Sequence, residues 1–385
     1  MPLKHAGTVP FAAVDRVYSA YRPEFDCAIQ RVLESGRYIL GAEVEAFEKV
    51  FAAWCGADSC IGVASGTDAI TLALRALEIG EGDAVITVSN TSVATIAAIE
   101  LAGAKPVLVD VDAKSMTMDP NALDSILRNW RYSQTAGVPK AIIAVHLYGN
   151  PCDMDSLCDI SARHGIKIIE DCAHAHGAQW RGRAVGTFGA AGAFSFYPTK
   201  NLGAFGDGGA VITSDRTVAM RCRMLRQYGW QTPQNSTIKG MNSRLDELQA
   251  AILLVRLGHL HEEITARQTL ASRYDQVVGR ITPVSSRSQI SSHAYHMYVI
   301  STNHRNHLEK YLHDNGIGTA ILYPTPIHQQ PAYADTITIQ GDGLPMTETL
   351  RSQILSLPMH PFLTNDESDK IIATLAAWQD HNTSA

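Results

Sequence analysis

Short apolar runs alternate with longer amphipathic stretches over the first half of the chain. Seven runs have the length and composition of strands: 60–64, 84–88, 106–109, 141–145, 166–169, 192–196 and 210–213. Stretches with helical spacing lie between most of them, at 93–101, 122–130 and 154–163. This alternation predicts an α/β fold in which a mostly parallel sheet is covered by helices on both faces.

The pattern changes near residue 242. Residues 243–278 have the spacing of one long helix, in which Gly258 allows a kink. Further elements are expected after this helix: a strand at 295–300 and helices at 307–315 and 366–379. We therefore place an N-terminal arm and a large domain in residues 1–250, and a small C-terminal α/β domain in residues 251–385.

The segment after the expected strand 192–196 carries a lysine in an unusual place. Lys200 lies between this apolar strand and a glycine-rich stretch that ends in Gly208-Gly209. Lysine is rarely buried, because removing its ammonium group from water is costly. A lysine that is held there has a lowered pKa, and only the neutral amine attacks a carbonyl group. Taken alone, Lys200 is more simply read as a solvated surface residue, so its chemical role depends on its neighbours.

Two other segments supply those neighbours. Asp171 ends the run that begins at Ile166, and ligands of open α/β sheets bind at the carboxyl ends of strands. Ser65 and Asp68 have capping-box spacing at the start of a helix, whose first-turn N–H groups form a natural phosphate site. A reactive amine, a carboxylate that can face a cationic ring nitrogen and a phosphate cradle together describe a pocket for pyridoxal 5′-phosphate (PLP).

These motifs also carry a family resemblance. The chain resembles the DegT–DnrJ–StrS family of sugar aminotransferases, within the fold type I group of PLP-dependent enzymes (the aspartate aminotransferase superfamily). The resemblance covers nearly the whole length, through the segments 36–41, 45–48, 65–69, 170–174, 196–203, 242–250, 323–328 and 355–358. It implies a large domain built on a mostly parallel seven-stranded sheet, followed by a smaller C-terminal α/β domain.

The resemblance implies a role for each cofactor residue. Lys200 would bind PLP covalently and, once released, move a proton as general base. Asp171 would keep the pyridine nitrogen protonated, and Ala173 would pack on one face of the ring. The lysine and the aspartate are therefore the expected catalytic residues.

The phosphate group of PLP would be held from two sides. The backbone amides of Gly66 and Thr67 and the hydroxyl of Ser195 are expected to bind it within one subunit. In the family an asparagine of the neighbouring subunit also reaches the phosphate, and Asn242 has the matching place. The resemblance therefore implies a homodimer with shared active sites.

Three positions depart from the commoner family pattern and concern the substrate rather than the reaction. His174 stands where many nucleotide-sugar 3-aminotransferases carry a glutamine against the cofactor, although other members have histidine. Ser92 replaces an aromatic residue that often stacks on the PLP ring, and Leu322 replaces a frequent histidine. Three residues are the expected substrate contacts: Tyr228, Tyr323 and His328.

Composition agrees with a soluble cytoplasmic enzyme. The chain has 385 residues, 45% of them hydrophobic, and a formal net charge of −6, which gives no general attraction to nucleic acid. No apolar run approaches the roughly 18 residues that a membrane helix needs. The seven cysteines include no C-x-x-C pair, which favours free thiols in a reducing compartment. His174 and His176 alone are too few ligands for a metal site, so none is expected.

The resulting prediction is a PLP-dependent aminotransferase that converts a nucleotide-linked, dTDP-type 3-keto-6-deoxyhexose to the 3-amino sugar, with glutamate as amino donor. Such sugars serve surface polysaccharides such as lipopolysaccharide, or antibiotics. The alternative is a 4-aminotransferase acting on a dTDP-, UDP- or GDP-linked 4-keto sugar. A PLP-dependent sugar dehydratase is disfavoured, because those relatives carry histidine in place of Lys200. A PLP-binding regulatory protein is disfavoured because no DNA-binding segment or basic face is evident.

Overall fold

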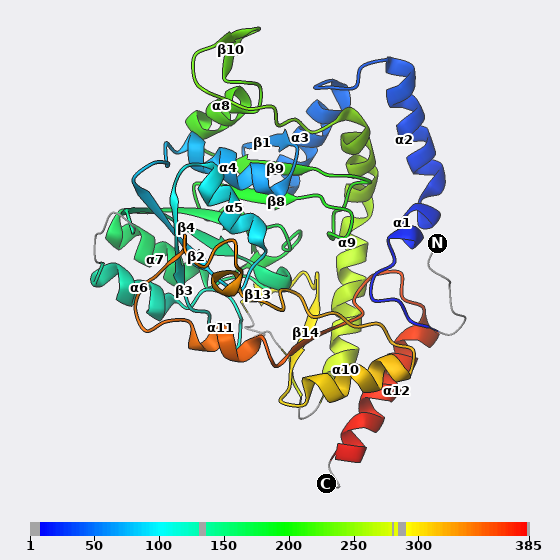
Figure 1. The fold of residues 1–385 in the computed structure, drawn as a ribbon. Coiled ribbons are helices and arrows are strands. Elements are labelled where there is room, and N and C mark those ends of the chain that lie inside the picture. The colour runs from blue at the N-terminus through cyan, green and yellow to red at the C-terminus, as the bar shows by residue number, and fades with distance from the viewer. Residues whose placement is uncertain (1–7, 131–135, 279–280, 284–289, 383–385) are drawn as a thin grey trace.

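The computed structural model describes residues 8–130, 136–278, 281–283 and 290–382, and its centre is an eight-stranded sheet (Figure 1). The strand order is β1-β9-β8-β5-β4-β2-β3-β15. All pairs from β8 to β15 are parallel, whereas β9 is antiparallel to both of its neighbours. The strands are β1 (Ser59–Val63), β2 (Asp83–Val88), β3 (Lys105–Val109), β4 (Val138–Val145), β5 (Lys167–Asp171), β8 (Ala191–Ser195), β9 (Gly209–Thr213) and β15 (Thr338–Ile339).

The mostly parallel sheet is confirmed, and all seven expected strands belong to it. Its eighth strand was not foreseen, so the predicted count is corrected from seven to eight. This strand, β15, is two residues long and comes from the C-terminal part of the chain to pair with β3 at the sheet edge. Two residues are too few to show an alternating pattern, which explains why this strand could not be predicted from the sequence.

Helices surround this sheet (Figure 1). The helices before residue 226 are α1 (Val14–Ala20), α2 (Arg22–Ser35), α3 (Ala42–Cys55), α4 (Gly66–Ala76), α5 (Val93–Leu101), α6 (Pro120–Arg128), α7 (Met154–His164) and α8 (Arg216–Leu225). The three helices expected between strands are α5, α6 and α7, with ends within two residues of the prediction. Neighbouring residues of β8 enter different hydrophobic clusters, Ala193 with α4 and Phe194 with α3, so this strand is buried on both faces.

A single long helix, α9 (Glu247–Asp275), connects the sheet to the C-terminal elements. Its 29 residues are continuous through Gly258, which confirms the expected single long helix. Leu253 and Leu257 pack with the large sheet, whereas Leu270 and Tyr274 pack with the C-terminal elements. The predicted domain boundary at residue 250 falls in the first turn of α9, and the division there remains a prediction.

The C-terminal elements form a small sheet with helices against it (Figure 1). The sheet has the order β12-β14-β16, and its strands are β12 (Thr282–Pro283), β14 (Tyr298–Ser301) and β16 (Ile354–Leu357). Helices α10 (Arg305–Asp314) and α12 (Asn365–Asn382) pack with this sheet, whereas α11 (Pro345–Leu350) packs with the hydrophobic cluster of the large sheet. Short strands make up two further pairings: β10 (Trp230–Thr232) with β11 (Asn235–Ser236), and β6 (Gln179–Trp180) with β7 (Arg183–Ala184) and β13 (Ser291–Ser292). In the described part of the chain, no helix has the length and apolar character needed to cross a membrane.

Candidate active site

Lys200 lies in the turn that follows β8. Two backbone hydrogen bonds hold this turn, from the Lys200 N–H to the Tyr197 carbonyl and from the Ala204 N–H to the Phe196 carbonyl, both 2.8 Å long. The Lys200 side chain is half-buried and forms no ion pair with a described carboxylate. Burial lowers the pKa of Lys200 to about 8, against the opposing effect of Asp171. The turn thus presents an amine that is partly neutral at ordinary pH.

Asp171 ends the neighbouring strand β5 and is 6% exposed. Its carboxylate accepts hydrogen bonds from the Thr95 hydroxyl (2.9 Å) and the Ala173 N–H (3.1 Å). Burial raises the pKa of Asp171, and these two hydrogen bonds oppose that effect. No described basic side chain forms an ion pair with it, so this buried carboxylate is suited to a ligand that brings its own positive charge.

The first turn of α4 approaches the end of β8 closely. Ser65 is the N-cap of α4, and its side-chain oxygen accepts from the Asp68 N–H at 3.1 Å, which confirms the expected cap. A Cβ atom at Gly66 would lie 2.6 Å from the Ser195 Cβ, so only glycine allows this approach. The N–H groups of Gly66 and Thr67 are at the first turn, where a helix has free donors and a positive dipole end.

These groups line one cavity of about 280 Å³, which we call the sheet-edge cavity. It contains eight of the nine residues expected to bind the cofactor: Gly66, Thr67, Ser92, Asp171, Ala173, His174, Ser195 and Lys200. One cavity therefore brings together an amine, a buried carboxylate without a paired cation and the start of a helix. A phosphorylated pyridine aldehyde needs these three groups, for its aldehyde, its ring nitrogen and its phosphate. The residues present fit PLP.

His174 and Tyr323 also line this cavity. His174 Nδ1 accepts from the Tyr148 N–H at 3.2 Å, so the neutral ring carries its proton on Nε2. Burial lowers the pKa of His174 well below its ordinary value, which keeps the ring neutral. The Tyr323 ring lies nearly parallel to it, with 6.4 Å between ring centroids, and its backbone φ of 57° is uncommon for a bulky residue. Of the three expected substrate contacts, Tyr323 is the one brought to the cavity.

The other predicted residues lie elsewhere. Asn242 is exposed and does not line the sheet-edge cavity. Tyr228 is 44% exposed, beside Trp230 at the base of the β10–β11 hairpin. The His328 ring lies between the Ser89 hydroxyl, 2.7 Å from Nδ1, and Glu348.

One buried cluster contains side chains that can bind a metal ion, but hydrogen bonds already occupy them. His146, Glu170 and Cys172 place possible ligand atoms within 4.8 Å of one another. However, the Glu170 carboxylate already accepts from three backbone N–H groups at 2.6–2.8 Å and contacts His146 Nε2 at 3.1 Å. His146 Nδ1 accepts from the Cys152 N–H. We therefore interpret the cluster as a hydrogen-bond network that supports the end of β5.

The comparison with known proteins decides what this site belongs to. The model of the DegT/DnrJ/EryC1/StrS aminotransferase family matches residues 20–376. The chain belongs to this aminotransferase family. Both the family resemblance and the fold type I architecture are confirmed by this match and by solved structures.

Relatives of this aminotransferase match over nearly their whole length. A dTDP-3-amino-3,4,6-trideoxy-alpha-D-glucose transaminase of Streptomyces venezuelae is 43% identical over 376 residues, covering 97% of this chain and 96% of that protein. The erythromycin biosynthesis sensory transduction protein EryC1 of Saccharopolyspora erythraea is 44% identical, covering 96% and 99%. The crystal structure of S. venezuelae DesV in complex with a ketimine intermediate superposes with a TM-score of 0.91 at 42% identity, covering 97% and 99%.

Two sets of site residues in the aminotransferase escaped the sequence analysis. Thr95 contacts Asp171 from the first turn of α5, and its hydroxyl also lies 3.0 Å from that of Thr91. Arg256 and Arg267 line a second cavity, which Lys200 also borders. The sequence does hold a signal for the arginines, because they interrupt the apolar stripe of α9 at helical spacing. Thr95 carries no such signal, since its partner is distant in sequence.

Proposed function

We propose that this aminotransferase binds PLP in the sheet-edge cavity and converts a nucleotide-linked 3-keto-6-deoxyhexose to the 3-amino sugar. The observation that carries the proposal is the meeting of Lys200, Asp171 and the start of α4 on one cavity. The name of the S. venezuelae relative supports a dTDP-linked sugar aminated at carbon 3. We further propose glutamate as amino donor.

The residues of the chain would divide the work as follows. PLP, when bound, supplies a conjugated ring that takes up an electron pair. Asp171 would hold a proton on the ring nitrogen. Lys200 Nζ would bind the cofactor and, when free, take the proton from the α-carbon of the amino donor. The amides of Gly66 and Thr67, with the Ser195 hydroxyl, would bind the phosphate.

An absorption spectrum of the purified protein tests this proposal. We expect the long-wavelength band of lysine-bound PLP, and we expect glutamate to shift it to shorter wavelength. Lys200→Ala should lose the band and all detectable turnover, while its circular dichroism stays that of the wild type. A wild-type protein that shows no such band even with added PLP would refute the proposal, and a Lys200→Ala protein with normal turnover would refute the role of Lys200.

One feature of the site favours a second candidate, a 4-keto sugar acceptor. His174 lines the sheet-edge cavity. Histidine at this position resembles the family members that act on UDP-linked sugars and place the amine on carbon 4. Identifying the amino carbon of the product by NMR separates the two. An amine on carbon 4 would replace the 3-aminotransferase proposal.

We also propose that the enzyme is a homodimer in the cytoplasm. Asn242 is exposed and lines neither the sheet-edge cavity nor the second cavity beside Lys200, which suits a residue that serves the partner. The seven cysteines are all free, as in a reducing compartment. A mixture of inactive Lys200→Ala and Asn242→Ala subunits should regain part of the wild-type activity if the sites are shared, and should stay inactive if each subunit is self-sufficient.

A further inference from the structure

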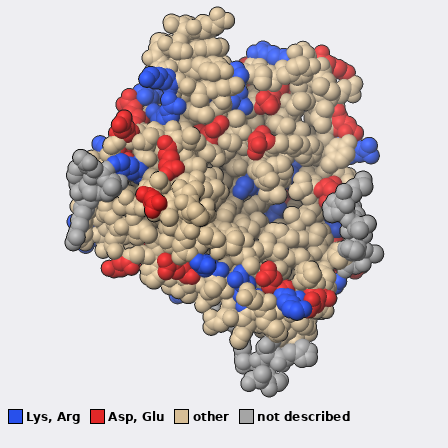
Figure 2. All heavy atoms as spheres, in the orientation of Figure 1, with Lys and Arg blue, Asp and Glu red and all other residues tan. Residues whose placement is uncertain are grey.

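A second cavity, of about 380 Å³, also borders Lys200 but is not lined by the start of α4; we call it the α9 cavity. Its walls come from distant parts of the chain: residues 11–17, the Lys200 turn, α9 and residues 359–362. Lys200, His174, Tyr197 and Tyr323 line both cavities, so a ligand in the α9 cavity lies next to the reactive amine. Figure 2 shows a hollow in the middle of one face of the molecule with basic side chains at its floor.

The charged residues that line the α9 cavity are all basic. Its basic residues are Lys200, Arg256 and Arg267, and none of the described residues that line it is acidic. Burial lowers the pKa of His360 to about 4 and that of His296 well below its ordinary value, so these two imidazoles are neutral at pH 7. The cavity is therefore a desolvated site with positive charge and is suited to an anion.

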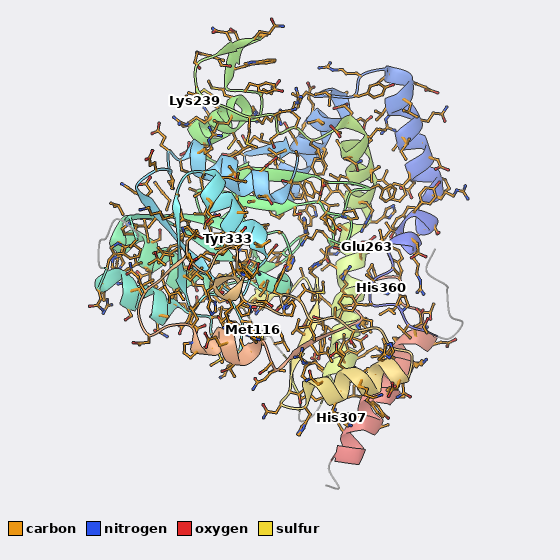
Figure 3. All side chains as sticks on the ribbon, viewed as in Figure 1. Met116, Lys239, Glu263, His307, Tyr333 and His360 are labelled. Atoms are coloured by element: carbon orange, nitrogen blue, oxygen red, sulfur yellow. The ribbon has the colours of Figure 1, made fainter. Side chains whose placement is uncertain are left out.

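Arg256 is already neutralised. It is 3% exposed, and its Nη2 contacts Glu263, also on α9, at 2.8 Å. The same nitrogen donates to the Asn201 carbonyl at 2.9 Å, which ties the arginine to the Lys200 turn. Figure 3 labels Glu263 on α9 and His360, which mark this region. Arg256 thus has a structural counter-ion and a structural task.

Arg267 differs from it. It is 6% exposed, and its Nη1 donates to the carbonyls of Tyr295 (3.1 Å) and Met359 (2.6 Å). Neither Nε nor Nη2 has a hydrogen-bonding partner among the described residues, and Arg267 forms no ion pair with any of them. These two nitrogens lie on the same edge of the guanidinium and form the fork that binds a carboxylate with two parallel hydrogen bonds. Burial lowers the pKa of Arg267 to about 10, against the opposing effect of Glu263, the carboxylate that is paired with Arg256.

We propose that the free edge of Arg267 binds a carboxylate of the amino donor in the α9 cavity and so directs the donor's amine toward Lys200. The amino donor must bring its amine to the reactive lysine, and its carboxylate can bring a negative charge to the basic residues of the α9 cavity. The inference rests on the proposed function, since it names the place where one of its two substrates binds. It assigns the sheet-edge cavity to the cofactor and the α9 cavity to the donor.

Titration of the PLP-loaded protein with glutamate tests the inference. Arg267→Met should keep the absorption band of bound PLP but raise the half-saturating glutamate concentration by about 10- to 100-fold, the usual effect of losing a charge-assisted hydrogen-bonded pair. Arg267→Lys, which keeps the charge but not the fork, should lie between Arg267→Met and the wild type. The KM for the ketosugar should change by less than about twofold. An unchanged response to glutamate, or an equal rise in the KM for the ketosugar, would overturn the inference.

Arg273→Met is the matched control. Arg273 lies on the same helix, contacts Ser368 and Asp369, and lines neither cavity. It should leave both substrate responses as in the wild type; a rise equal to that of Arg267→Met would mean that any loss of an α9 arginine weakens donor binding, and would overturn the assignment.

A second measurement avoids the risk that Arg267 variants fail to fold. Glutarate has two carboxylates and no amine, so its binding to the wild-type protein can be followed by calorimetry without turnover. We expect glutarate to bind and to compete with glutamate; no binding at millimolar concentration, or binding without competition, would overturn the inference. Because this readout needs no reaction, a failure of the inference can be told apart from a failure of the proposed function, which the absorption spectrum tests.

Discussion

The two cavities that meet at Lys200 are built in different ways. The sheet-edge cavity collects residues that end strands or begin helices, such as Asp171 at the end of β5 and Gly66 at the start of α4. The α9 cavity joins residues as far apart as Phe11, Arg267 and Phe362. In the sheet-edge cavity, a motif a few residues long determines the direction of each lining side chain. In the second, only the complete fold brings the groups together.

The difference also appears in how polar groups are satisfied. The Asp171 carboxylate is held by two hydrogen bonds from the protein before any ligand binds. The Arg267 guanidinium is held along one edge only. A carboxylate that the protein already holds in place suits a permanently bound cofactor. A guanidinium with unused hydrogen-bond donors suits a substrate that binds and dissociates in each turnover. Changes in the first cavity should therefore affect the cofactor and the rate, and changes in the second should affect donor concentration dependence.

Asp171→Asn should sharpen this comparison most. The amide has the size of the carboxylate but cannot hold a proton on the ring nitrogen, so kcat should fall on the order of 100-fold or more. The half-saturating glutamate concentration should stay within about twofold of the wild type, since the α9 cavity is untouched. Steady-state kinetics measures both.

Asp110→Asn provides the control, because Asp110 accepts from the N–H groups of Met346 and Thr347 and lines neither cavity. It should change stability and leave kcat nearly normal. A near-normal kcat in Asp171→Asn would remove Asp171 from the mechanism.

The pH dependence of cofactor capture tests the electrostatics of Lys200. With a pKa of about 8, the neutral fraction of Lys200 grows about tenfold per pH unit below that value and levels off above it. The rate at which the cofactor-free protein captures PLP should follow the same curve. Nα-acetyl-lysine in solution is the reference, with a rate that rises toward pH 10.4 or so. A protein that follows the free amino acid would show that burial does not lower the pKa of Lys200.

Most residues of the sheet-edge cavity could be predicted from the sequence, because each is marked by a local pattern. All seven long strands of the sheet were expected, and eight of nine predicted cofactor residues line the cavity. A strand end and a helix start fix the direction of the residues beside them, so Asp171 and Gly66 can be placed without knowing the rest of the chain.

Signals that depend on distant contacts were lost. The pairing of β15 with β3 joins residues 338 and 107, and two residues show no periodicity. Gly258 does not interrupt α9, and no atom outside its own helix lies within 4 Å of where its Cβ would be. The free edge of Arg267 depends on carbonyls from Tyr295 and Met359, which no spacing rule connects to α9.

Thr95→Val tests whether Asp171 needs its support from α5. Valine has the shape of threonine without the hydroxyl, so Asp171 loses one of its two hydrogen bonds. We expect kcat to fall by about tenfold, the order for a hydrogen bond to a charged group. The loss should also raise the pKa of Asp171 further, because that bond opposes the effect of burial. The acidic limb of the kcat profile should therefore move to higher pH.

Thr87→Val is the control for that variant, since the Thr87 hydroxyl donates to the Ile143 carbonyl within the buried sheet and does not contact Asp171. It should cost some stability and leave the pH profile in place. If Thr95→Val also leaves the profile in place, Thr95 serves only packing, and the carboxylate is oriented by Ala173 alone.

Ser92→Tyr has the smallest expected effect, because two changes oppose each other. Ser92 lines the sheet-edge cavity and is the N-cap of α5, where its hydroxyl accepts from the Ala94 N–H. Losing the cap costs about 1 kcal/mol, whereas a ring stacked on the cofactor contributes about 0.5–1.5 kcal/mol. Ser92→Ala loses the cap without adding a ring, so the ratio of PLP dissociation constants between these two variants isolates stacking. We expect Ser92→Tyr to bind PLP several-fold more tightly than Ser92→Ala; equal affinities would mean that position 92 does not lie over the cofactor ring, and that the first cavity gains nothing from an aromatic residue there.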